Sequence, residues 1–445
     1  PGILKNQLGK IFAKLLYGSK FHTMKQARGQ QGIGISAAGM YGQLTTGKPV
    51  KVISRTHKRK PANLVEVAIN TQKNAPDLLK EETLETWELD HGTEVTIELT
   101  GRYQRGRTSV DEYLRQTAIA NPHLTLRYAA PDGVRFDCER STREMPAEPK
   151  EIRPHPYGVE LGMLLKMLQS TRAKKIGAFL QQDFSRISPR LAKELCAKAG
   201  ISPIGWVKSI TREECEKLYQ AIQETKIMAP PTDCVVPIGE ELIIKSLRAQ
   251  FEADLYFSVT RPPSVYRGNP FVIEVGCAYG GKLAAAEEEG DSGPQPASVL
   301  RLANRVPLIH QPAACCITRS IIGTNWRNYG LAQPRGALPC GPMVLLAHMA
   351  SVWVPFTSEA KEAIADYPEI EKEITLALQE VGRRLAAHVR KVRRNQEIEK
   401  KKSYISKYIP HIAIGLQDIL GFADREKSLL ENKLEDMLEK THLQV

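Results

Sequence analysis

The segment ARGQQGIGISAAGMYGQLTTGKP, residues 27–49, contains three glycine patterns that are each typical of phosphate-binding loops. The P-loop pattern, residues 42–48, is followed by Pro49 where that motif needs a hydroxyl group for Mg²⁺, and a strand-like stretch comes next instead of a helix. The second pattern, residues 32–37, has the spacing of a dinucleotide fingerprint, but no strand is predicted before it. Both patterns therefore lack the flanking elements that their chemistry requires.

The third pattern, GQQGIGIS at residues 29–36, joins a flexible glycine loop to the start of a predicted amphipathic helix, ISAAGMYGQLTTG. Gly29, Gly32 and Gly34 allow the backbone to approach a ligand closely. The amide groups at the start of the helix then face an anion, and the helix dipole favours negative charge there. This arrangement suits a triphosphate. A glycine-rich turn without a ligand has the same sequence pattern, so the loop alone leaves both interpretations open.

The elements around this loop are predicted from the spacing of apolar residues. Residues 3–24 carry apolar side chains at helical spacing. Four alternating, β-branched stretches follow, and we predict that they are strands of one sheet: VKVISRT, ANLVEVAIN, GTEVTIELTGRY and HLTLRYA. Residues 159–226 return to short helices, among them SPRLAKELCAKAG, with Ser188 as N-cap, Pro189 in the first turn and Gly200 at the end.

The remainder of the chain is predicted as a second mixed region. Helices alternate with strands such as FVIEVGCAYGG and MVLLAHMASVWV between residues 240 and 360. One long charged helix is predicted from Glu369 to about Ser403. Stretches rich in proline and charge at residues 143–158 and 226–239 are predicted domain boundaries.

The composition is that of an ordinary globular protein, with 42% hydrophobic and 25% charged residues in a chain of 445, a length typical of two to four domains. No long apolar run is present, so no membrane partner is expected, and no apolar leader opens the chain, so secretion is not expected. The eight scattered cysteines indicate buried thiols in a reducing cytosol or nucleus rather than zinc ligands or disulfides. The net charge of +12 favours nucleic acid as a partner and is equally compatible with a merely basic soluble protein.

Several long stretches resemble one known family. GSKFHTMKQARGQQGIGIS, residues 18–36, resembles the ATP lid and glycine motif of the B subunit of DNA topoisomerase VI, which shares the Bergerat ATP fold with gyrase, Hsp90, histidine kinases and MutL. HGTEVTIELTGRY, residues 91–103, resembles a late strand of that fold. Four motifs between residues 267 and 365 resemble its transducer domain: RGNPFVIEVGCAYGG, VLRLANRVPLIH, NWRNYGL and LPCGPMVLLAHMASVWVPFTSEAKEAIA. The length and order of these motifs make the resemblance specific.

The resemblance implies an α+β protein with three domains. Residues 1–152 are expected to form most of a Bergerat-type ATP-binding α/β sandwich, residues 153–230 a small helix–two-turns–helix module, and residues 231–445 a β-α-β transducer domain with a long C-terminal helix. PGI at residues 1–3 resembles the tail of the adenine-reading motif. The Mg²⁺-ligating Asn, the general-base Glu and the adenine-reading Asp of the family are therefore expected upstream of this sequence, and the chain alone is expected to bind ATP poorly.

The resemblance also implies the site residues. Lys361, in SEAKEAIA, corresponds to the transducer lysine that reaches the ATP site; it is the only catalytic residue that we assign, and no metal ligand is assigned. A flexible ammonium group suits contact with the γ-phosphate, although most lysines are simply exposed. The residues expected to hold the nucleotide are Ser19, Lys20, Gly29, Gln30, Gln31, Gly32, Ile33, Gly34, Ile35, Ser36 and Lys361.

The function implied by the resemblance is that of the ATP-binding and ATP-hydrolysing gate subunit of a type IIB DNA topoisomerase, with ATP and Mg²⁺ as cofactors. The expected partners are an A subunit that cleaves DNA, in an A2B2 heterotetramer, a second copy of the ATPase subunit when ATP binds, and double-stranded DNA. The expected location is the cytoplasm at the nucleoid in a prokaryote, or the nucleus in a eukaryote.

Two alternatives remain. A non-hydrolysing scaffold that partners a meiotic DNA-break subunit need not keep phosphate ligands, so GQQGIGIS and Lys361 argue against it. An ATPase of the mismatch-repair or chaperone type lacks a helical module between its ATP domain and its transducer, and the predicted short helices of residues 159–226 argue against that class.

Two basic stretches and one apolar stretch are candidate contact surfaces. The run at residues 383–402 has nine Lys or Arg against two acids, and it could contact DNA phosphates, although a solvated helix has the same composition. The C-terminal segment IAIGLQDILGFADREKSLLENKLEDMLEK is amphipathic and is expected to dock the A subunit or to pack within its own domain. The basic residues of the helical module that could contact phosphate are Lys174, Lys175, Arg186, Arg190, Lys193 and Lys198.

Overall fold

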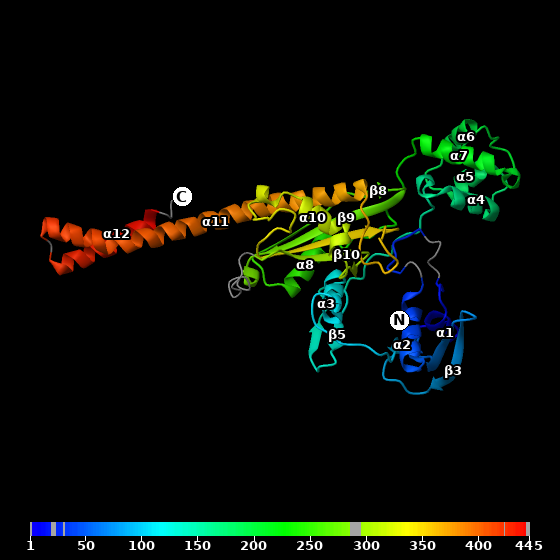
Figure 1. The fold of residues 1–445 in the computed structure, drawn as a ribbon, viewed down its shortest axis with the longest axis horizontal. Coiled ribbons are helices and arrows are strands. Elements are labelled where there is room, and N and C mark those ends of the chain that lie inside the picture. Colours follow the sequence, from blue (N-terminus) through cyan, green and yellow to red (C-terminus); the bar gives the residue numbers. More distant parts are fainter. Residues whose placement is uncertain (1, 19–23, 30–31, 285–294, 422, 442–445) are drawn as a thin grey trace.

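The computed structural model describes residues 2–18, 24–29, 32–284, 295–421 and 423–441, and these form an elongated α+β molecule (Figure 1). The described strands belong to a four-stranded sheet, a six-stranded sheet and a two-stranded hairpin. Figure 1 shows the four-stranded sheet, a group of short helices and a long helical arm arranged around the six-stranded sheet.

The first body is an antiparallel sheet in the order β3-β2-β1-β4, with two helices packed on it. Val52 of β1 lies opposite Val65 of β2, and both belong to a buried cluster that includes Leu8 and Phe12 of α1. The apolar alternation of these strands therefore gives the sheet one buried face. The elements are α1 (Lys5–Ala13), α2 (Gly34–Thr46), β1 (Val50–Arg55), β2 (Ala62–Asn70), β3 (Ala75–Leu84) and β4 (Gly92–Thr96).

Two predictions for this body need correction. Residues 3–24 do not form one helix, because α1 ends at Ala13 and Leu16 has a φ of +57°. Strand β3 is absent from the predicted elements, and it pairs with β2 along its whole length. This edge strand exposes most of its side chains, so it lacks the apolar alternation by which a half-buried strand is identified in sequence.

Helix α3 (Val110–Ala120) and the hairpin of β5 (Leu126–Ala129) and β6 (Arg135–Cys138) form a separate unit. The prediction that HLTLRYA joins the sheet of β1, β2 and β4 is wrong, because among the described strands β5 pairs with β6 alone. Helix α3 packs against α8 and β11 of the large sheet, and Ile119 shares a buried cluster with Leu247.

Residues 156–224 fold into a group of short helices with a buried core of its own. As predicted, Ser188 is the N-cap of α6, Pro189 occupies the first turn, and Gly200, with a φ of +69°, follows the helix end. The elements are η1 (Pro156–Gly158), α4 (Leu161–Ser170), α5 (Ile176–Asp183), α6 (Pro189–Lys198), η2 (Val207–Ser209) and α7 (Arg212–Glu224).

The six-stranded sheet has the order β11-β10-β12-β9-β7, with β8 paired to β9. Strands β10 and β12 are parallel and are linked by a crossover that contains α10, whereas the other pairs are antiparallel. All nine residues of β12 are buried, because apolar clusters cover both faces of the sheet. The strands are β7 (Leu255–Thr260), β8 (Ser264–Tyr266), β9 (Asn269–Tyr279), β10 (Ser298–Ala303), β11 (Val306–Pro307) and β12 (Met343–Ser351).

Helices cover this sheet on both sides. Ile243 of α8 belongs to one cluster and Leu378 of α11 to the other, so the sheet lies between these two helices. The helices are α8 (Glu240–Gln250), η3 (Pro312–Ala314), α10 (Cys316–Gly323), η4 (Trp326–Tyr329), α11 (Pro368–Leu420) and α12 (Asp424–Thr441).

The long arm consists of the second half of α11 with α12 folded back along it (Figure 1). The predicted helix end near Ser403 is too early, because α11 continues through Pro410 to Leu420. Ile409 and Ala413, one turn apart, are buried in this part. No helix in the described segments is both long and apolar enough to cross a membrane.

The eight cysteines are free thiols, as predicted, and six of them are buried. Burial raises the pKa of the Cys234 thiol to about 11, so this group stays protonated and unreactive at neutral pH.

Candidate nucleotide-binding site

At the start of α2, backbone donors have no acceptor in the described part of the chain. The N-cap position is Ile33, which has no side-chain cap to offer, and no acidic side chain stands in the first turn. Within the described residues, no acceptor is bonded to the amides of Gly34, Ile35 or Ser36, and the buried Ser36 hydroxyl donates to the Ile33 carbonyl at 3.1 Å. Unpaired amides at the positive end of a helix dipole favour an anion.

Two glycines near these amides have open space where a side chain would begin. A Cβ atom added at Gly29 or Gly34 would meet no atom within 4 Å, so packing against the protein does not require glycine at either position. Gly32 has a φ of +61°, a conformation that favours glycine. Open space beside unpaired amides fits a phosphate group that approaches the backbone.

Close packing fixes the position of α2. A Cβ atom at Gly39 would lie 2.6 Å from a side-chain carbon of β1, and one at Gly42 would lie 2.6 Å from the Glu98 carbonyl oxygen. Gln43 Oε1 accepts a hydrogen bond from the Ile69 amide at 2.8 Å, and Gln43 Nε2 donates to the Ile69 carbonyl at 3.3 Å. The small residues let α2 approach the sheet, and the glutamine holds it there.

The rejected P-loop pattern has a structural role instead. Gly47 is the left-handed C-cap of α2, and its amide donates to the Gln43 carbonyl at 2.9 Å. Lys48 Nζ lies 2.5 Å from Glu98 Oε2 and forms an exposed ion pair.

The predicted nucleotide-binding residues divide into three groups. Ser19, Lys20, Gln30 and Gln31 lie outside the described residues. The stretch of Gly29 and residues 32–36 runs from the loop into the first turn of α2 and contains Gly32, Ile33, Gly34, Ile35 and Ser36. Lys361 lies on the other domain, and no hydrogen bond or ion pair joins it to the described residues of the loop.

Lys361 occupies a turn in the loop after β12. The Lys361 amide donates to the Ser358 carbonyl at 3.1 Å, and its φ is +57°, which is unusual for a residue with a side chain. The side chain is half-buried, and in the described part of the chain it has no carboxylate partner. Burial alone lowers the pKa of its ammonium group. Lys361 is therefore a partly desolvated, unpaired cation rather than an exposed lysine at a helix start.

The segment before the glycine loop is bonded to the large sheet domain. The Gln26 amide donates to the Cys234 carbonyl at 3.0 Å, and Gln26 Oε1 accepts from the Val236 amide at 2.5 Å. Asn304 Nδ2 donates to the Ala27 carbonyl at 3.0 Å. The glycine loop therefore starts from backbone that is attached to the neighbouring domain.

Basic groups gather where this segment meets α3 and the large sheet. Burial lowers the pKa values of Arg28 and Arg305, although the Glu274 carboxylate opposes the shift at Arg305. Burial and the charges of both arginines lower the pKa of His123. The Arg28 guanidinium donates to Asn121 Oδ1, and Asn121 Nδ2 donates to the Arg305 carbonyl at 3.4 Å. Excess positive charge thus lies beside the loop that is expected to bind phosphates.

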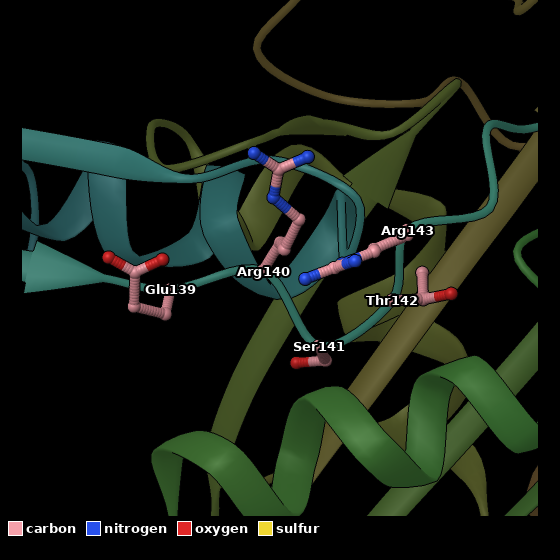
Figure 2. A pocket seen from close by; sticks show the side chains of 5 residues that line it. All are labelled: Glu139, Arg140, Ser141, Thr142 and Arg143. Carbon is pink, nitrogen blue, oxygen red and sulfur yellow. The ribbon is translucent and has the colours of Figure 1, made fainter.

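A charged surface hollow of about 710 Å³ is lined by Glu139–Arg143, in the loop after β6 (Figure 2). The amides of Ser141 and Thr142 donate to the Pro122 carbonyl at 2.7 and 3.1 Å, which fixes the loop beside the end of α3. None of the predicted site residues lines this hollow, and its lining lacks the apolar surface that is typical of small-molecule pockets.

The described residues contain no group of three or more His, Cys, Asp or Glu side chains that could hold a metal ion.

The large sheet domain defines the class of protein first: residues 230–401 match the family model described as "Topoisomerase VI B subunit, transducer". The relatives agree over nearly the whole chain. The B subunit of type 2 DNA topoisomerase 6 from Methanococcoides burtonii is 47% identical over 94% of this chain and 66% of its own length. The proteins of the same name from Archaeoglobus fulgidus and Pyrococcus horikoshii are 46% and 34% identical, over 94% and 98% of this chain and 68% and 83% of their own lengths.

The chain therefore belongs to the family formed by the B subunits of type 2 DNA topoisomerase 6. It spans about 66% of the length of the first relatives that it matches. Among solved structures, the B subunit of DNA gyrase from Myxococcus xanthus covers 75% of this chain and 66% of its own at 12% identity and a TM-score of 0.30, a likeness too distant to bear on the site.

Sequence reasoning missed the residues that connect the two domains, Gln26, Arg28, Asn304 and Arg305. The sequence did contain one signal for the turn, an Asn between two apolar stretches. In the structure Asn304 and Arg305 form the two-residue turn between β10 and β11, with φ values of +47° and +65°. A central Asn between two apolar strands is typical of such a turn. Nothing in the sequence shows that its side chain reaches Ala27.

Proposed function

We propose that this chain is the ATP-binding and ATP-hydrolysing gate subunit of a type IIB DNA topoisomerase. The carrying observation is the uncapped start of α2, where the first amides have no acceptor among the described residues and a Cβ atom at Gly29 or Gly34 would meet nothing within 4 Å. Membership in the family of type 2 DNA topoisomerase 6 B subunits supports the same function.

In this proposal the glycine loop and the first turn of α2 hold the phosphates through backbone amides. When bound, ATP supplies the phosphoanhydride bond whose hydrolysis drives the gate. Lys361 contributes a positive charge at the terminal phosphate from the other domain. Because this ammonium group is partly desolvated and has no carboxylate partner among the described residues, an anion would relieve an unfavourable state.

Mg²⁺ is proposed as the second cofactor. By resemblance, the Asn expected upstream of this sequence and the nucleotide phosphates would hold it.

The proposed division has three domains, and α3 with the β5–β6 hairpin is assigned to the first of them although it packs on the third. Residues 1–152 form the Bergerat-type ATP-binding domain, residues 153–230 the helix–two-turns–helix module and residues 231–445 the transducer. The separate buried clusters of α1 with β1 and β2, of α4–α7 and of the large sheet support this division. Helix α3 packs on the transducer, so it would transmit movement between the first and third units.

The proposed partners are the A subunit in an A2B2 assembly, a second copy of this chain when ATP is bound, and double-stranded DNA. The exposed apolar side chains of the long arm, among them Tyr404, Ile405, Tyr408 and Ile412, support docking of the A subunit there. We propose a cytoplasmic, nucleoid-associated location in a prokaryote and a nuclear one in a eukaryote.

The test is relaxation of supercoiled plasmid by the full-length protein, which includes the ATP-site residues expected upstream of this sequence, assembled with its A subunit. Lys361→Ala is expected to reduce ATP hydrolysis and relaxation at least tenfold, because the charge at the terminal phosphate is lost. Lys372→Ala, which removes an exposed lysine on the first turns of α11, is the matched control and should leave both activities unchanged.

The outcomes separate the candidate functions. If Lys361→Ala retains full ATP turnover and relaxation, the role of Lys361 is wrong. If the unmodified full-length protein with its A subunit supports DNA breakage but neither binds nor hydrolyses ATP, the non-hydrolysing scaffold is the correct function.

A further inference from the structure

The side chain of Asn304 joins three backbone groups from two distant parts of the chain. Nδ2 donates to the Ala27 carbonyl at 3.0 Å and to the Ser351 carbonyl at 2.9 Å, and Oδ1 accepts from the Ser351 amide at 2.9 Å. The Asn304 amide donates to the Met349 carbonyl at 2.9 Å, so the turn itself is attached to β12. Asn304 is only 4% exposed, so bulk solvent does not compete for these bonds.

The two partners of Asn304 lead directly to the two halves of the proposed phosphate site. Ala27 stands two residues before Gly29, where the glycine loop begins. Ser351 is the last residue of β12, and the loop that follows it carries Lys361. The same amide nitrogen therefore contacts the backbone that leads to the glycine loop and the backbone that leads to the lysine.

The turn that carries Asn304 is hydrogen-bonded to a buried pair of polar side chains, His348 and Glu274. The Arg305 amide donates to His348 Nε2 at 3.0 Å, and His348 Nδ1 lies 2.7 Å from Glu274 Oε2. Both His348 and Glu274 are fully buried. Because the backbone of this turn is fixed, the Asn304 side chain has little freedom to move with Ala27 while it loses its bonds to Ser351, or the reverse.

The residue type matches this task. Asparagine tolerates the left-handed conformation that Asn304 adopts, at a φ of +47°. Its amide group offers both donors needed by the two carbonyls and the acceptor needed by the Ser351 amide. Aspartate would keep the acceptor but place a carboxylate oxygen against two carbonyl oxygens.

We propose that Asn304 is a positioning residue that couples the glycine loop to the Lys361 loop, so that loss of the terminal phosphate moves both together. This inference rests on the proposed ATP-dependent function. Asn304 touches no nucleotide in this scheme; it transmits position between two backbone segments.

The experiment uses the full-length protein assembled with its A subunit and measures nucleotide affinity, the kcat and KM of ATP hydrolysis, and plasmid relaxed per ATP hydrolysed. Asn304→Asp and Asn304→Gly are the variants, and glycine retains the left-handed turn without the amide group. Asn269→Asp and Asn269→Gly, at the β8–β9 turn of the same sheet, are matched controls, because the one partner of Asn269 Nδ2 among the described residues is the nearby Arg267 carbonyl, at 3.3 Å.

Both Asn304 variants are expected to bind ATP within about threefold of the unmodified protein and to keep KM, while relaxation per ATP falls about tenfold or more. A cycle with Lys361→Ala should be non-additive, because the two residues act on one step. Relaxation per ATP equal to that of the Asn269 controls, or full additivity with Lys361→Ala, would overturn the role of Asn304 and leave the proposed function standing. Failure of the unmodified protein and the controls to couple ATP to relaxation would overturn the proposed function, and this inference with it.

Discussion

At the scale of single residues, the core of the transducer contains a buried, ionised carboxylate, that of Glu274. Glu274 is fully buried, and its carboxylate accepts hydrogen bonds from the amides of Ile238 and Gly239, each at 2.7 Å, and faces His348 Nδ1 at 2.7 Å. Burial acts to raise the pKa of Glu274, but the interactions with His348 and the two amides outweigh it, and the pKa lies below its usual value. The negative charge is therefore part of the folded structure.

Glu274→Gln is expected to destabilise the protein by about 3 kcal/mol, because an amide donor would then face the backbone amides. The pH dependence has a definite sign. The folded pKa is lower than the unfolded value of about 4.3, so this stabilisation is complete above that value and is lost as pH falls through the folded pKa. Chemical denaturation between pH 7 and pH 3 should show a flatter profile for the variant.

Glu252→Gln is the control for this prediction, since the Glu252 carboxylate is exposed and its partner among the described side chains is Lys282. Equal unfolding free energies for Glu274→Gln and Glu252→Gln at pH 7 would contradict the assignment of a buried ionised carboxylate.

At the scale of elements, α2 contains two kinds of glycine. Some allow close packing against the sheet, and one has open space where a side chain would begin. Gly42 contacts the backbone after β4, where a Cβ atom would lie 2.6 Å from the Glu98 carbonyl oxygen. Gly34 stands at the helix start, where a Cβ atom would meet nothing. One helix therefore carries both a structural and a candidate ligand-binding glycine.

Gly42→Ala is expected to destabilise the first body by about 1–3 kcal/mol through overpacking. Gly34→Ala should leave stability unchanged or raise it by up to about 1 kcal/mol, yet weaken binding of a fluorescent ATP analogue, because its methyl group enters the space proposed for the phosphates. Thermal unfolding and equilibrium titration measure the two effects. Unchanged nucleotide affinity in Gly34→Ala, with unchanged stability, would argue against a phosphate at this helix start.

The long arm presents an apolar face that its own hairpin does not cover. Ile409 and Ala413 are buried, whereas Ile405 and Ile412 are 43% and 48% exposed on the same helix. Exposed apolar side chains at helical spacing are typical of a docking surface.

Ile405→Asp with Ile412→Asp is expected to weaken the affinity for the A subunit at least tenfold, about 1.4 kcal/mol, and to leave the melting temperature nearly unchanged. Ser403→Asp, which adds a carboxylate at an exposed position of the same helix, is the control. A large fall in melting temperature with normal affinity for the A subunit would show that these side chains pack within the chain instead.

At the scale of the whole molecule, the net charge is +12, but many of its basic side chains already have partners and are less free to bind a polyanion. In the helical module, Lys175 Nζ lies 3.8 Å from the centre of the Trp206 ring, Lys198 pairs with Glu194, and Arg186 donates to a backbone carbonyl. Lys174, Arg190 and Lys193 are exposed and have no acidic partner among the described residues. Along α11, Arg383 and Arg384 pair with Glu380, which offsets part of the predicted basic run.

Replacement of Lys174, Arg190 and Lys193 by alanine is expected to weaken binding to duplex DNA at low salt. The slope of log affinity against log salt should become shallower by about 3, since each phosphate contact contributes roughly 0.9. Replacing Lys175 and Lys198, whose charges are already engaged, should change the slope much less. Equal slopes for the triple and the double variant would exclude the module as a major DNA contact.

The sequence by itself determined those features that depend on neighbours along the chain. Strands β1 and β2 follow their apolar alternation, α6 follows Ser188, Pro189 and Gly200, and the motifs identified the family. The P-loop was correctly rejected, because Pro49 excludes its hydroxyl ligand. Each of these depends on local geometry that a few adjacent side chains fix.

Only the tertiary structure decided features that depend on contacts between distant segments. Edge strand β3 has no buried face, β5 pairs with β6 rather than with the first sheet, and α11 continues to Leu420 with α12 folded against it. Asn304 is the clearest case, because its three partners come from positions 27 and 351. A side chain's hydrogen bonds are fixed by which backbone groups folding brings within about 3 Å, and no local pattern in a single sequence encodes that proximity.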